Sequence, residues 1–278
     1  MKTNQYKILK QLIKLSIEED KAHQDITTKF LIPNNFKINA KIISKNEGVL
    51  FGVNVVKEII KKIDKKLKVK LFKKDGAKLK KKSKVLEIKG NAKSILKGER
   101  IFLNYLGHLT GVSTETNKLV TKTKKYKTKI CCTRKTIPGL RYLQKQAVKT
   151  GGGTNNRYNL KQEIFIKDNH HLNENNFKKK IITVIKKNKN KKIINVEVDN
   201  INQLKQIIHL QINRILLDNF SPNNLKKALK IIPKKIETEA SGNITPKNII
   251  QYAKTGVDRI SLGYLTHSVK NFDFSLEF

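Results

Sequence analysis

The stretch INVEVDNINQLKQIIHLQINRILLDN, residues 194–219, has the pattern of a strand, a helix and a second strand. Its two ends, INVEV and RILLD, are short runs rich in Ile, Leu and Val, which is typical of buried strands. Between them, INQLKQIIHL spaces its apolar residues at helical intervals. A helix that connects two strands in this way usually makes them parallel. The stretch therefore predicts one unit of a parallel α/β sheet.

The same alternation extends to both sides of this unit. Six apolar runs are expected to be strands: residues 129–133, 163–167, 194–198, 214–218, 235–239 and 259–263. Helical spacing occurs in residues 138–148, 175–187, 201–210, 222–232 and 245–256. Repeated strands and helices of this kind indicate a parallel sheet that is either open or closed into a barrel.

Polar residues at the strand ends distinguish these two arrangements. The expected strands lead into Thr133-Arg134-Lys135, Lys167-Asp168-Asn169-His170, Glu197, Asp218-Asn219, Glu239-Ala240-Ser241-Gly242 and Gly263. Such groups at the carboxyl ends of successive strands are typical of an α/β barrel, whose site is built from the loops after the strands. An open doubly wound sheet usually carries a GxGxxG turn, which the sequence lacks. We therefore expect an α/β barrel.

The first part of the chain has a different pattern. Residues 6–16 have helical spacing, and residues 37–89 contain short β-rich runs with a helical stretch, VNVVKEIIKKI, among them. A long helical pattern then covers residues 92–122, where Gly107 and Gly111 indicate either close packing or a break. This part predicts a small antiparallel sheet with helices against it, so the chain should form two compact units.

Charge is the most unusual feature of the composition. The formal net charge is +38, and 54 of the 60 basic residues are Lys. A nucleic-acid partner would explain such a charge, but the lysines are spread along the whole chain and aromatic residues make up only 6%. Frequent Lys, Ile and Asn with few Arg also fit an AT-rich genome. We interpret most of the charge as solvated surface and expect no specific nucleic-acid partner.

Cysteine use and apolar runs suggest where the protein resides. Cys131 and Cys132 are adjacent and are not expected to bridge each other. The N-terminal residues lack the apolar core of a signal peptide, and no apolar run approaches the 18 or so residues that span a bilayer. The expectation is a reduced, cytoplasmic protein with no membrane partner.

Arginine is rare in this chain, so its positions are informative. Arg100, Arg134, Arg141 and Arg157 fall within a short part of the sequence, and Arg157 follows Gly151-Gly152-Gly153 closely. A guanidinium is favoured over an ammonium group where a carboxylate must be gripped by two parallel hydrogen bonds. The glycines would allow close approach of the backbone to a ligand. Surface salt bridges are the alternative, above all for Arg141.

Two carboxylates and a set of small residues predict a second part of the site. Glu197 and Asp218 end consecutive strands, as expected for Mg²⁺ shared with a polyphosphate, although they could also pair with Lys135 or Lys167. Ser241-Gly242 and Gly263 end the last two strands, where barrels commonly bind phosphate. His267 could join them, or it could cap a helix or lie in the core. Zinc is not expected at His170-His171, because no cysteine or second ligand pair is nearby.

These residues belong to an ordered series of motifs that resembles one enzyme family. The series is EEDKAHQDITT, ERIFLNYLGHLTGVST, TRKTIPGLR, KTGGGTNNRYNL, IKDNHH, VEVDN, LLDNFS, EASGNIT and TGVDRISLGYLTHS, and the resemblance runs from about Ser16 to the C-terminus. It is similar to the quinolinate phosphoribosyltransferases (nicotinate-nucleotide pyrophosphorylases). The resemblance implies transfer of phosphoribose from phosphoribosyl pyrophosphate to quinolinate, with decarboxylation, to form nicotinate mononucleotide for NAD biosynthesis.

The resemblance also implies a fold and an assembly. The expected fold is α/β, with an N-terminal α/β sandwich domain over residues 1–108 and an incomplete, seven-stranded type of α/β barrel over residues 109–269. A last strand at about residues 270–278 returns to the first domain. Family members are homodimers, sometimes hexamers, and Arg100 would reach the site of the neighbouring subunit.

Roles follow for the residues that match the motifs. Arg134, Arg157 and Lys167 would hold the two quinolinate carboxylates, and Lys135, Glu197 and Asp218 would serve phosphoribosyl pyrophosphate and Mg²⁺. The 5′-phosphate would lie among Ser241, Gly242, Gly263 and His267. Lys135, Lys167, Glu197 and Asp218 are therefore the expected catalytic residues, and Glu197 and Asp218 the metal ligands.

The sequence departs from the family pattern at one position of interest. Asn156 stands where the family has a histidine that is expected to contact quinolinate, so we expect a raised KM for quinolinate that Asn156→His lowers. Gln24 replaces a glycine, which is structurally minor. The alternatives are a molybdenum-transport-associated paralogue with another substrate, a nicotinate phosphoribosyltransferase, or a nucleic-acid-binding protein on a degenerate scaffold.

Overall fold

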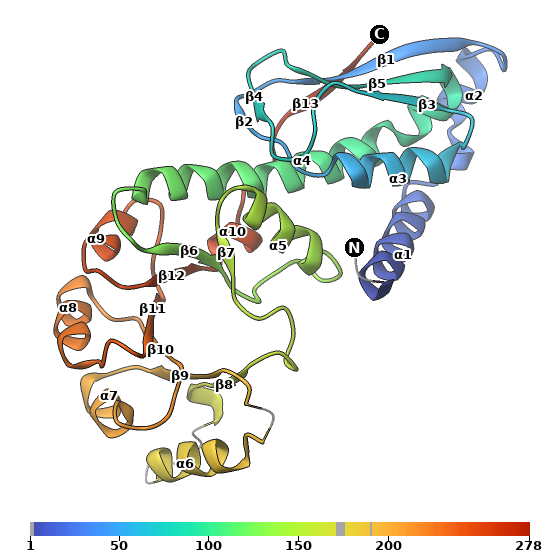
Figure 1. Cartoon of the computed structure of the whole chain (residues 1–278). Helices are drawn as coiled ribbons and strands as arrows, with labels where there is room; N and C mark the ends of the chain where they lie inside the picture. Colours follow the sequence, from blue (N-terminus) through green and yellow to red (C-terminus); the bar gives the residue numbers. More distant parts are fainter. Residues whose placement is uncertain (1–2, 171–175, 190) are drawn as a thin grey trace. The chain divides into compact units, whose positions relative to one another are not determined.

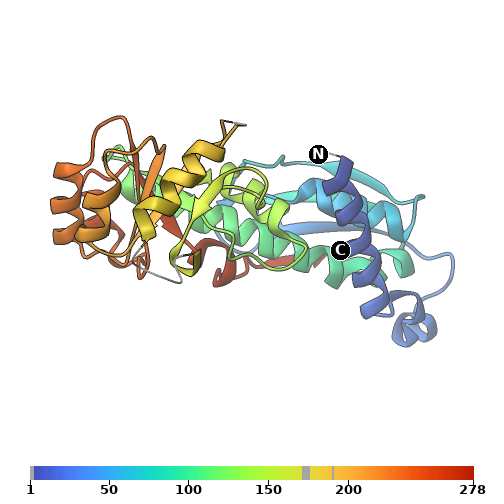
Figure 2. The same cartoon turned by 90° about the horizontal axis from the view of Figure 1, so that it is seen from below.

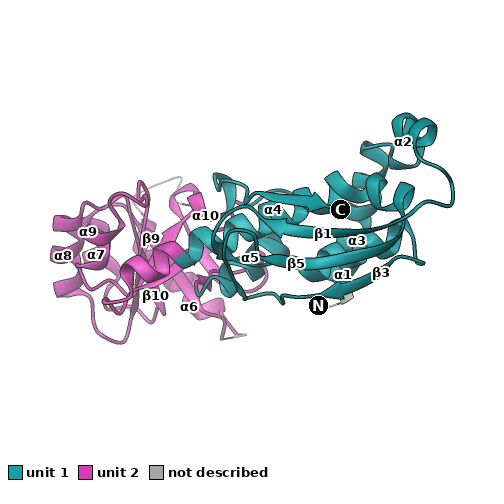
Figure 3. Ribbon diagram, turned by 90° about the horizontal axis from the view of Figure 1, so that it is seen from above, with its two compact units in different colours: residues 1–117, 136–152, 266–278 teal, residues 118–135, 153–265 magenta. Residues whose placement is uncertain are grey.

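The structure, a computed structural model, describes residues 3–170, 176–189 and 191–278 and divides into two compact units. Unit 1 comprises residues 1–117, 136–152 and 266–278, and unit 2 comprises residues 118–135 and 153–265 (Figure 3). The fold is α/β, as expected. Within the described residues, no helix is both long enough and apolar enough to cross a membrane.

Unit 1 is built on a four-stranded antiparallel sheet in the order β13-β1-β5-β3. Its strands are β1 (Lys37–Ser44), β3 (Lys68–Leu71), β5 (Lys84–Asn91) and β13 (Phe274–Glu277). A separate ladder joins β2 (Gly48–Val49) to β4 (Lys78–Leu79). Because β13 pairs with β1, the C-terminal strand lies in the same sheet as the first strand of the chain.

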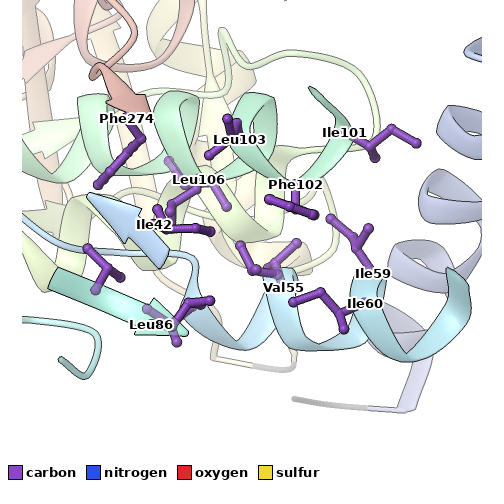
Figure 4. Packing of buried hydrophobic residues seen from close by; sticks show 14 of the residues in the cluster. Ile42, Val55, Ile59, Ile60, Leu86, Ile101, Phe102, Leu103, Leu106 and Phe274 are labelled. Carbon is purple, nitrogen blue, oxygen red and sulfur yellow. The ribbon is translucent and has the colours of Figure 1, made fainter. Parts of the chain in front are cut away.

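Helices cover this sheet and bury its apolar face. Unit 1 contains α1 (Thr3–Glu19), η1 (Ala22–Gln24), α2 (Ile26–Leu31), α3 (Val53–Ile63) and α5 (Arg141–Thr150), and shares the long helix α4 (Ala92–Thr123). Side chains of α3 and α4 meet those of β1 and β5 in one core, which includes Ile42, Val55, Ile59, Leu86, Phe102 and Leu106 (Figure 4). The expected small antiparallel sheet with helices against it is confirmed.

Glycines in α4 mark close packing and not a break, because the helix is continuous through them. A Cβ built on Gly111 would lie 2.4 Å from the carbonyl oxygen of Lys270, and one built on Gly107 would lie 2.7 Å from that of Phe272. The segment that leads into β13 therefore crosses α4 at these two positions.

We expect Gly111→Ala to lower the free energy of unfolding by about 1–3 kcal/mol, since the new methyl group meets rigid backbone. Gly98→Ala, in the same helix, is the matched control. There the new methyl group meets Ile63 Cδ1, the end of a flexible side chain, and alanine has the better helix propensity. Urea denaturation measures both changes, and equal losses in the two variants would contradict the packing argument.

Unit 2 contains a seven-stranded sheet in the order β7-β6-β12-β11-β10-β9-β8, in which the paired strands are parallel. Its strands are β6 (Lys129–Cys132), β7 (Thr154–Asn155), β8 (Ile164–Ile166), β9 (Ile194–Val198), β10 (Arg214–Asp218), β11 (Glu237–Ser241) and β12 (Arg259–Leu262). All six strands expected from the sequence are present. Only the two-residue β7 was missed, because polar Thr154-Asn155 is too short to form a pattern.

The sheet curls but does not close. β12 pairs with β6, the first strand of the unit, whereas β7 and β8 form the two edges of the described sheet. Helices α6 (Phe177–Lys187), α7 (Ile201–Ile207), α8 (Pro222–Ile231) and α9 (Ile249–Ala253) connect successive strands on the outer side (Figures 1 and 2). The short helices η2 (Asp168–His170) and α10 (Tyr264–His267) follow β8 and β12. The expected incomplete α/β barrel is thereby confirmed.

Candidate functional site

Polar side chains gather at the carboxyl edge of the sheet in unit 2. Lys167 directly follows β8, Glu197 lies near the end of β9, and Asp218 and Ser241 are the last residues of β10 and β11. Asp218 and Ser241 are paired in the register of the two strands. Since parallel strands end at the same edge, these groups face one region of the half-barrel.

Glu197 is a buried carboxylate with a cationic partner. Its Oε2 lies 3.2 Å from Lys167 Nζ, and its side chain is almost completely buried. Burial raises the pKa of Glu197, the positive charge of Lys167 lowers it, and Asp218 and Asp168 raise it further. The net pKa is raised, chiefly because burial penalises the charged form of the carboxyl group.

Asp218 has the same electrostatic character. Burial is the main reason that its pKa is raised, followed by repulsion from Asp199. Lys167, a hydrogen bond from Ser241 and the charge of Lys135 act in the opposite direction. Lys135 and Lys167 therefore both lie close enough to act on one carboxylate. Two desolvated carboxylates flanked by two lysines favour binding of a cation together with an anion.

The loops after β10 and β11 lie against each other at this edge. The backbone N–H of Asn219 donates to the carbonyl oxygen of Ser241 at 2.9 Å, and Asn243 Nδ2 donates to Asn219 Oδ1 at 3.0 Å. Gly242 has a φ of 84°, and a Cβ there would lie 2.8 Å from the backbone nitrogen of Asn219. Only glycine fits this turn without strain.

A basic pocket of about 400 Å³ opens beside these residues in unit 2. The residues that line this basic pocket include Arg134, Arg157, Lys161, Glu163, Phe165, Lys167, His170 and Lys192. The ring of Phe165 lies beneath two of the cations, with its centroid 5.1 Å from Arg157 Cζ and 4.9 Å from Lys167 Nζ. The pocket thus combines an aromatic surface with several positive charges.

Arg157 is the most deeply buried of the Arg and Lys side chains that line the basic pocket. The residue is only 8% exposed, and its NH1 donates to the carbonyl oxygen of Glu163 at 3.0 Å. Burial, and next the positive charge of Arg134, lower the pKa of Arg157. Its buried Nε has no hydrogen-bond partner among the described residues. A desolvated donor beside a second guanidinium favours an anionic ligand with planar, paired acceptors.

Comparison with known proteins gives the family. Residues 25–110 match the N-terminal domain and residues 112–277 the C-terminal domain of quinolinate phosphoribosyl transferase. The chain belongs to the quinolinate phosphoribosyltransferase family. It is 37% identical over 273 residues to a probable nicotinate-nucleotide pyrophosphorylase [carboxylating] from Bacillus subtilis, covering 97% of this chain and 93% of that protein.

Other members of the quinolinate phosphoribosyltransferase family agree along nearly the whole chain. A mitochondrial quinolinate phosphoribosyltransferase [decarboxylating] from Nicotiana tabacum is 34% identical, over 97% of this chain and 82% of its own length. The structure of the nicotinate-nucleotide pyrophosphorylase from Francisella tularensis superposes with a TM-score of 0.91 at 39% identity, covering 98% of this chain and 96% of that one. Fold and sequence therefore point to the same family.

The side chain of Asn156 makes three buried hydrogen bonds. Its side chain is buried in the interior of the half-barrel, where Nδ2 donates to Glu239 Oε1 at 2.7 Å and to Ser261 Oγ at 2.9 Å. Its Oδ1 accepts a hydrogen bond from Arg259 NH2 at 2.7 Å. Asn156 is not among the residues that line the basic pocket, and its contact with quinolinate stays a prediction.

Two expected site residues belong to unit 1, and the glycine run has a structural explanation. Arg100, in α4, is exposed, and so is His267, whose Nδ1 lies 2.5 Å from Ser268 Oγ.

A Cβ on Gly151 would lie 2.4 Å from the carbonyl oxygen of Ser113 in α4, and Gly152 has a φ of 90°. Packing and turn geometry thus account for these two glycines without a ligand.

Several residues that line the basic pocket were not predicted as site residues, among them Glu163, Phe165 and His170. Glu163 lies directly before β8 and Phe165 lies within it, and both were interpreted only as parts of a strand. His170 was considered only for zinc, but its Nδ1 accepts the backbone N–H of Lys167 at 3.0 Å. Alternation along β8 would have placed Glu163, Phe165 and Lys167 on one face. His171 lies outside the described residues.

The carboxylates of Glu197 and Asp218 fit Mg²⁺. Mg²⁺ prefers hard oxygen ligands and commonly takes one or two carboxylates together with phosphate oxygens of a substrate. Among the described residues, no group of three or more His, Cys, Asp or Glu side chains is arranged around a single metal position. The pair is therefore suited to a metal whose remaining ligands come from a bound polyphosphate and water.

Proposed function

We propose that this chain transfers the phosphoribosyl group of phosphoribosyl pyrophosphate to quinolinate, releasing pyrophosphate and CO₂ and forming nicotinate mononucleotide. The basic pocket carries the proposal. Quinolinate is a flat ring with two adjacent carboxylates, which match the guanidinium groups of Arg134 and Arg157 and the ammonium group of Lys167 around the Phe165 ring. The relatives named quinolinate phosphoribosyltransferase support this substrate.

The lysines and carboxylates beside the basic pocket suit phosphoribosyl pyrophosphate. Lys135 and Lys167 would neutralise the departing pyrophosphate, and Glu197 and Asp218 would hold Mg²⁺. Bound Mg²⁺ supplies further charge stabilisation for that leaving group. Ser241, Gly242 and Gly263 would accommodate the 5′-phosphate at the ends of β11 and β12. A role for His267 in binding this phosphate stays a prediction.

Positioning and electrostatics are sufficient for this reaction. The pyridine nitrogen attacks the ribosyl carbon as the bond to pyrophosphate breaks, and the nitrogen becomes positively charged. The adjacent carboxylate then leaves as CO₂, the electron pair of the broken bond stays on the ring carbon beside the positively charged nitrogen, and that carbon takes up a proton from water. The residues need only orient two bound substrates and stabilise negative charge, so no side-chain nucleophile is required.

The direct test is an assay of purified protein with quinolinate, phosphoribosyl pyrophosphate and Mg²⁺, in which nicotinate mononucleotide and CO₂ are both measured. Nicotinate replaces quinolinate in the control reaction. We expect equal amounts of the two products from quinolinate and no product from nicotinate. Turnover of nicotinate, or no turnover by folded protein, would overturn the proposal.

We also propose that the enzyme is a homodimer in which Arg100 serves the site of the neighbouring subunit. Arg100 is exposed on α4, as such a role requires. Arg100→Ala and Asp218→Asn should each be inactive alone. A mixture that has exchanged subunits should regain activity, because the Arg100→Ala subunit keeps its own carboxylates and receives an intact arginine from its partner. Failure of proven heterodimers to regain activity would contradict the arrangement.

A further inference from the structure

The interior of the half-barrel in unit 2 contains a buried network of charged and polar side chains. We call it the interior network; it comprises Asn156, Glu163, Arg214, Glu237, Glu239, Arg259 and Ser261. Glu239, at its centre, has no exposed surface. Its Oε1 accepts hydrogen bonds from Asn156 Nδ2 at 2.7 Å and from Ser261 Oγ at 2.5 Å.

One side of the interior network anchors the backbone next to Arg157. The amide of Asn156 donates to Glu239 and Ser261 and accepts from Arg259, as described above, so the orientation of its side chain is determined by three partners. Arg157 is the next residue in the chain. The backbone that runs from β7 through Asn156 to Arg157 is therefore held at the interior of the half-barrel by the side chain of Asn156.

The other side of the interior network holds the guanidinium of Arg157. Arg214 NH1 lies 3.4 Å from Glu163 Oε2, and its Nε donates to Glu237 Oε2 at 2.6 Å. Glu163 is thereby held in place, and its backbone carbonyl oxygen accepts the hydrogen bond from Arg157 NH1. Arg259 NH1 also lies 3.4 Å from Glu237, which joins the two sides.

We propose that Glu163 and Asn156 are positioning residues that together hold Arg157 in the basic pocket. This inference rests on the proposed function, because it assigns Arg157 to a carboxylate of quinolinate. Ion pairs that are mostly buried have fixed geometry and need every partner. The interior network holds the backbone next to Arg157 through Asn156 and the guanidinium of Arg157 through Glu163. Together the two contacts restrict the position of the guanidinium more than either contact alone.

The interior network also explains why asparagine occupies position 156. The amide supplies two donors, to Glu239 and Ser261, and one acceptor, to Arg259. A neutral imidazole has one donor and one acceptor, and a protonated one has no acceptor and would repel Arg259. Asn156→Ala and Asn156→His should therefore both raise the KM for quinolinate, the latter opposite to the expectation from the family motif.

Glu163→Gln provides the decisive test, because a positioning role and a simple lining role predict opposite signs. If Glu163 only lined the basic pocket, removing its negative charge would strengthen binding of a dicarboxylate. If it positions Arg157, its loss should raise the KM for quinolinate about tenfold, as expected when a binding group is displaced slightly. The KM for phosphoribosyl pyrophosphate and kcat should each stay within about twofold of the wild-type values.

Binding measured without turnover separates this inference from the proposed function. Phthalate has the same adjacent carboxylates but no ring nitrogen, and calorimetry should show its Kd raised about tenfold by Glu163→Gln and by Asn156→Ala. In the double variant the increase should be smaller than the product of the two, since both act on Arg157. Glu18→Gln, at an exposed pair with Lys14, is the control and should change nothing.

Each outcome of these measurements has a clear meaning. Unchanged or tighter phthalate binding by folded Glu163→Gln would overturn the inference. An inactive wild-type protein that still binds phthalate, with binding weakened in both variants, would instead overturn the proposed reaction and leave the positioning role in place. If Asn156→Ala does not fold, Glu163→Gln alone decides, because Glu163 lies at the margin of the interior network.

Discussion

Replacing Arg157 by methionine should raise the KM for quinolinate at least a hundredfold and leave the KM for phosphoribosyl pyrophosphate nearly unchanged. Arg157 is almost fully buried, and its Nε has no hydrogen-bond partner among the described residues. Removing one partner of a buried ionic contact costs about 3–5 kcal/mol, which corresponds to a factor of roughly a hundred to a few thousand in affinity. Steady-state kinetics in which each substrate is varied separately measures the effect.

Arg157→Lys is the matched control for this substitution. Lysine retains the charge but not the planar fork of the guanidinium group. We therefore expect a KM for quinolinate between those of the methionine variant and the wild type. The ligand-free methionine variant should be no less stable to heat than the wild type, because burial and Arg134 both disfavour the charged form of Arg157. A methionine variant that binds phthalate as well as the wild type does would exclude Arg157 from carboxylate recognition.

Asp218→Asn should reduce kcat on the order of a hundred- to a thousandfold and at the same time raise the thermal midpoint at neutral pH. The loss of activity follows from the proposed roles of Asp218 as a ligand for Mg²⁺ and a partner of the lysines, and such single electrostatic groups commonly contribute effects of this size. The gain in stability follows from burial and Asp199, which raise the pKa of Asp218 in the folded protein.

The pH dependence tests this gain directly. A carboxyl group whose folded pKa lies above its unfolded pKa contributes its full stability below the unfolded value and loses it as the pH rises through the folded value. The thermal midpoint of Asp218→Asn should therefore exceed that of the wild type most at neutral pH, and the difference should shrink below pH 4 or so, near the unfolded pKa. Asp20→Asn, at an exposed position, should show no such difference.

The architecture follows from patterns that the sequence displays openly. Runs such as RILLD and RISLG are apolar because β10 and β12 are buried, and the helical spacing between them leaves only a parallel sheet. The two-residue β7 carries no such pattern. Its strand character comes from pairing with Cys131 and Cys132 of β6, a contact between distant residues. Local periodicity therefore predicts long buried strands and misses a short polar edge.

The candidate site was predictable in part for the same reason. Strand ends identify Glu197, Asp218 and Lys167, because the carboxyl edge of a parallel sheet is common to all strands. The buried hydrogen bonds of Asn156 were not predicted, because a motif gives a residue's position in the chain but not the direction of its side chain. The signal was nevertheless present: alternation puts Arg214, Glu237, Glu239, Arg259 and Ser261 on one face of neighbouring strands. Polar residues repeated on that face predict a charged interior.

The open edge of the half-barrel separates ligand recognition from sheet assembly. In a closed barrel each connection is constrained by the stagger of the strands on both sides. Here residues 158–162, between Arg157 and Glu163, lie in the connection of the two edge strands, β7 and β8, which do not pair with each other in the described sheet. Changes in the length or composition of this segment can reshape the basic pocket without shifting any strand register. Evolution, or protein engineering, can therefore change which carboxylate substrate the basic pocket prefers by altering this segment, while the rest of the half-barrel folds as before.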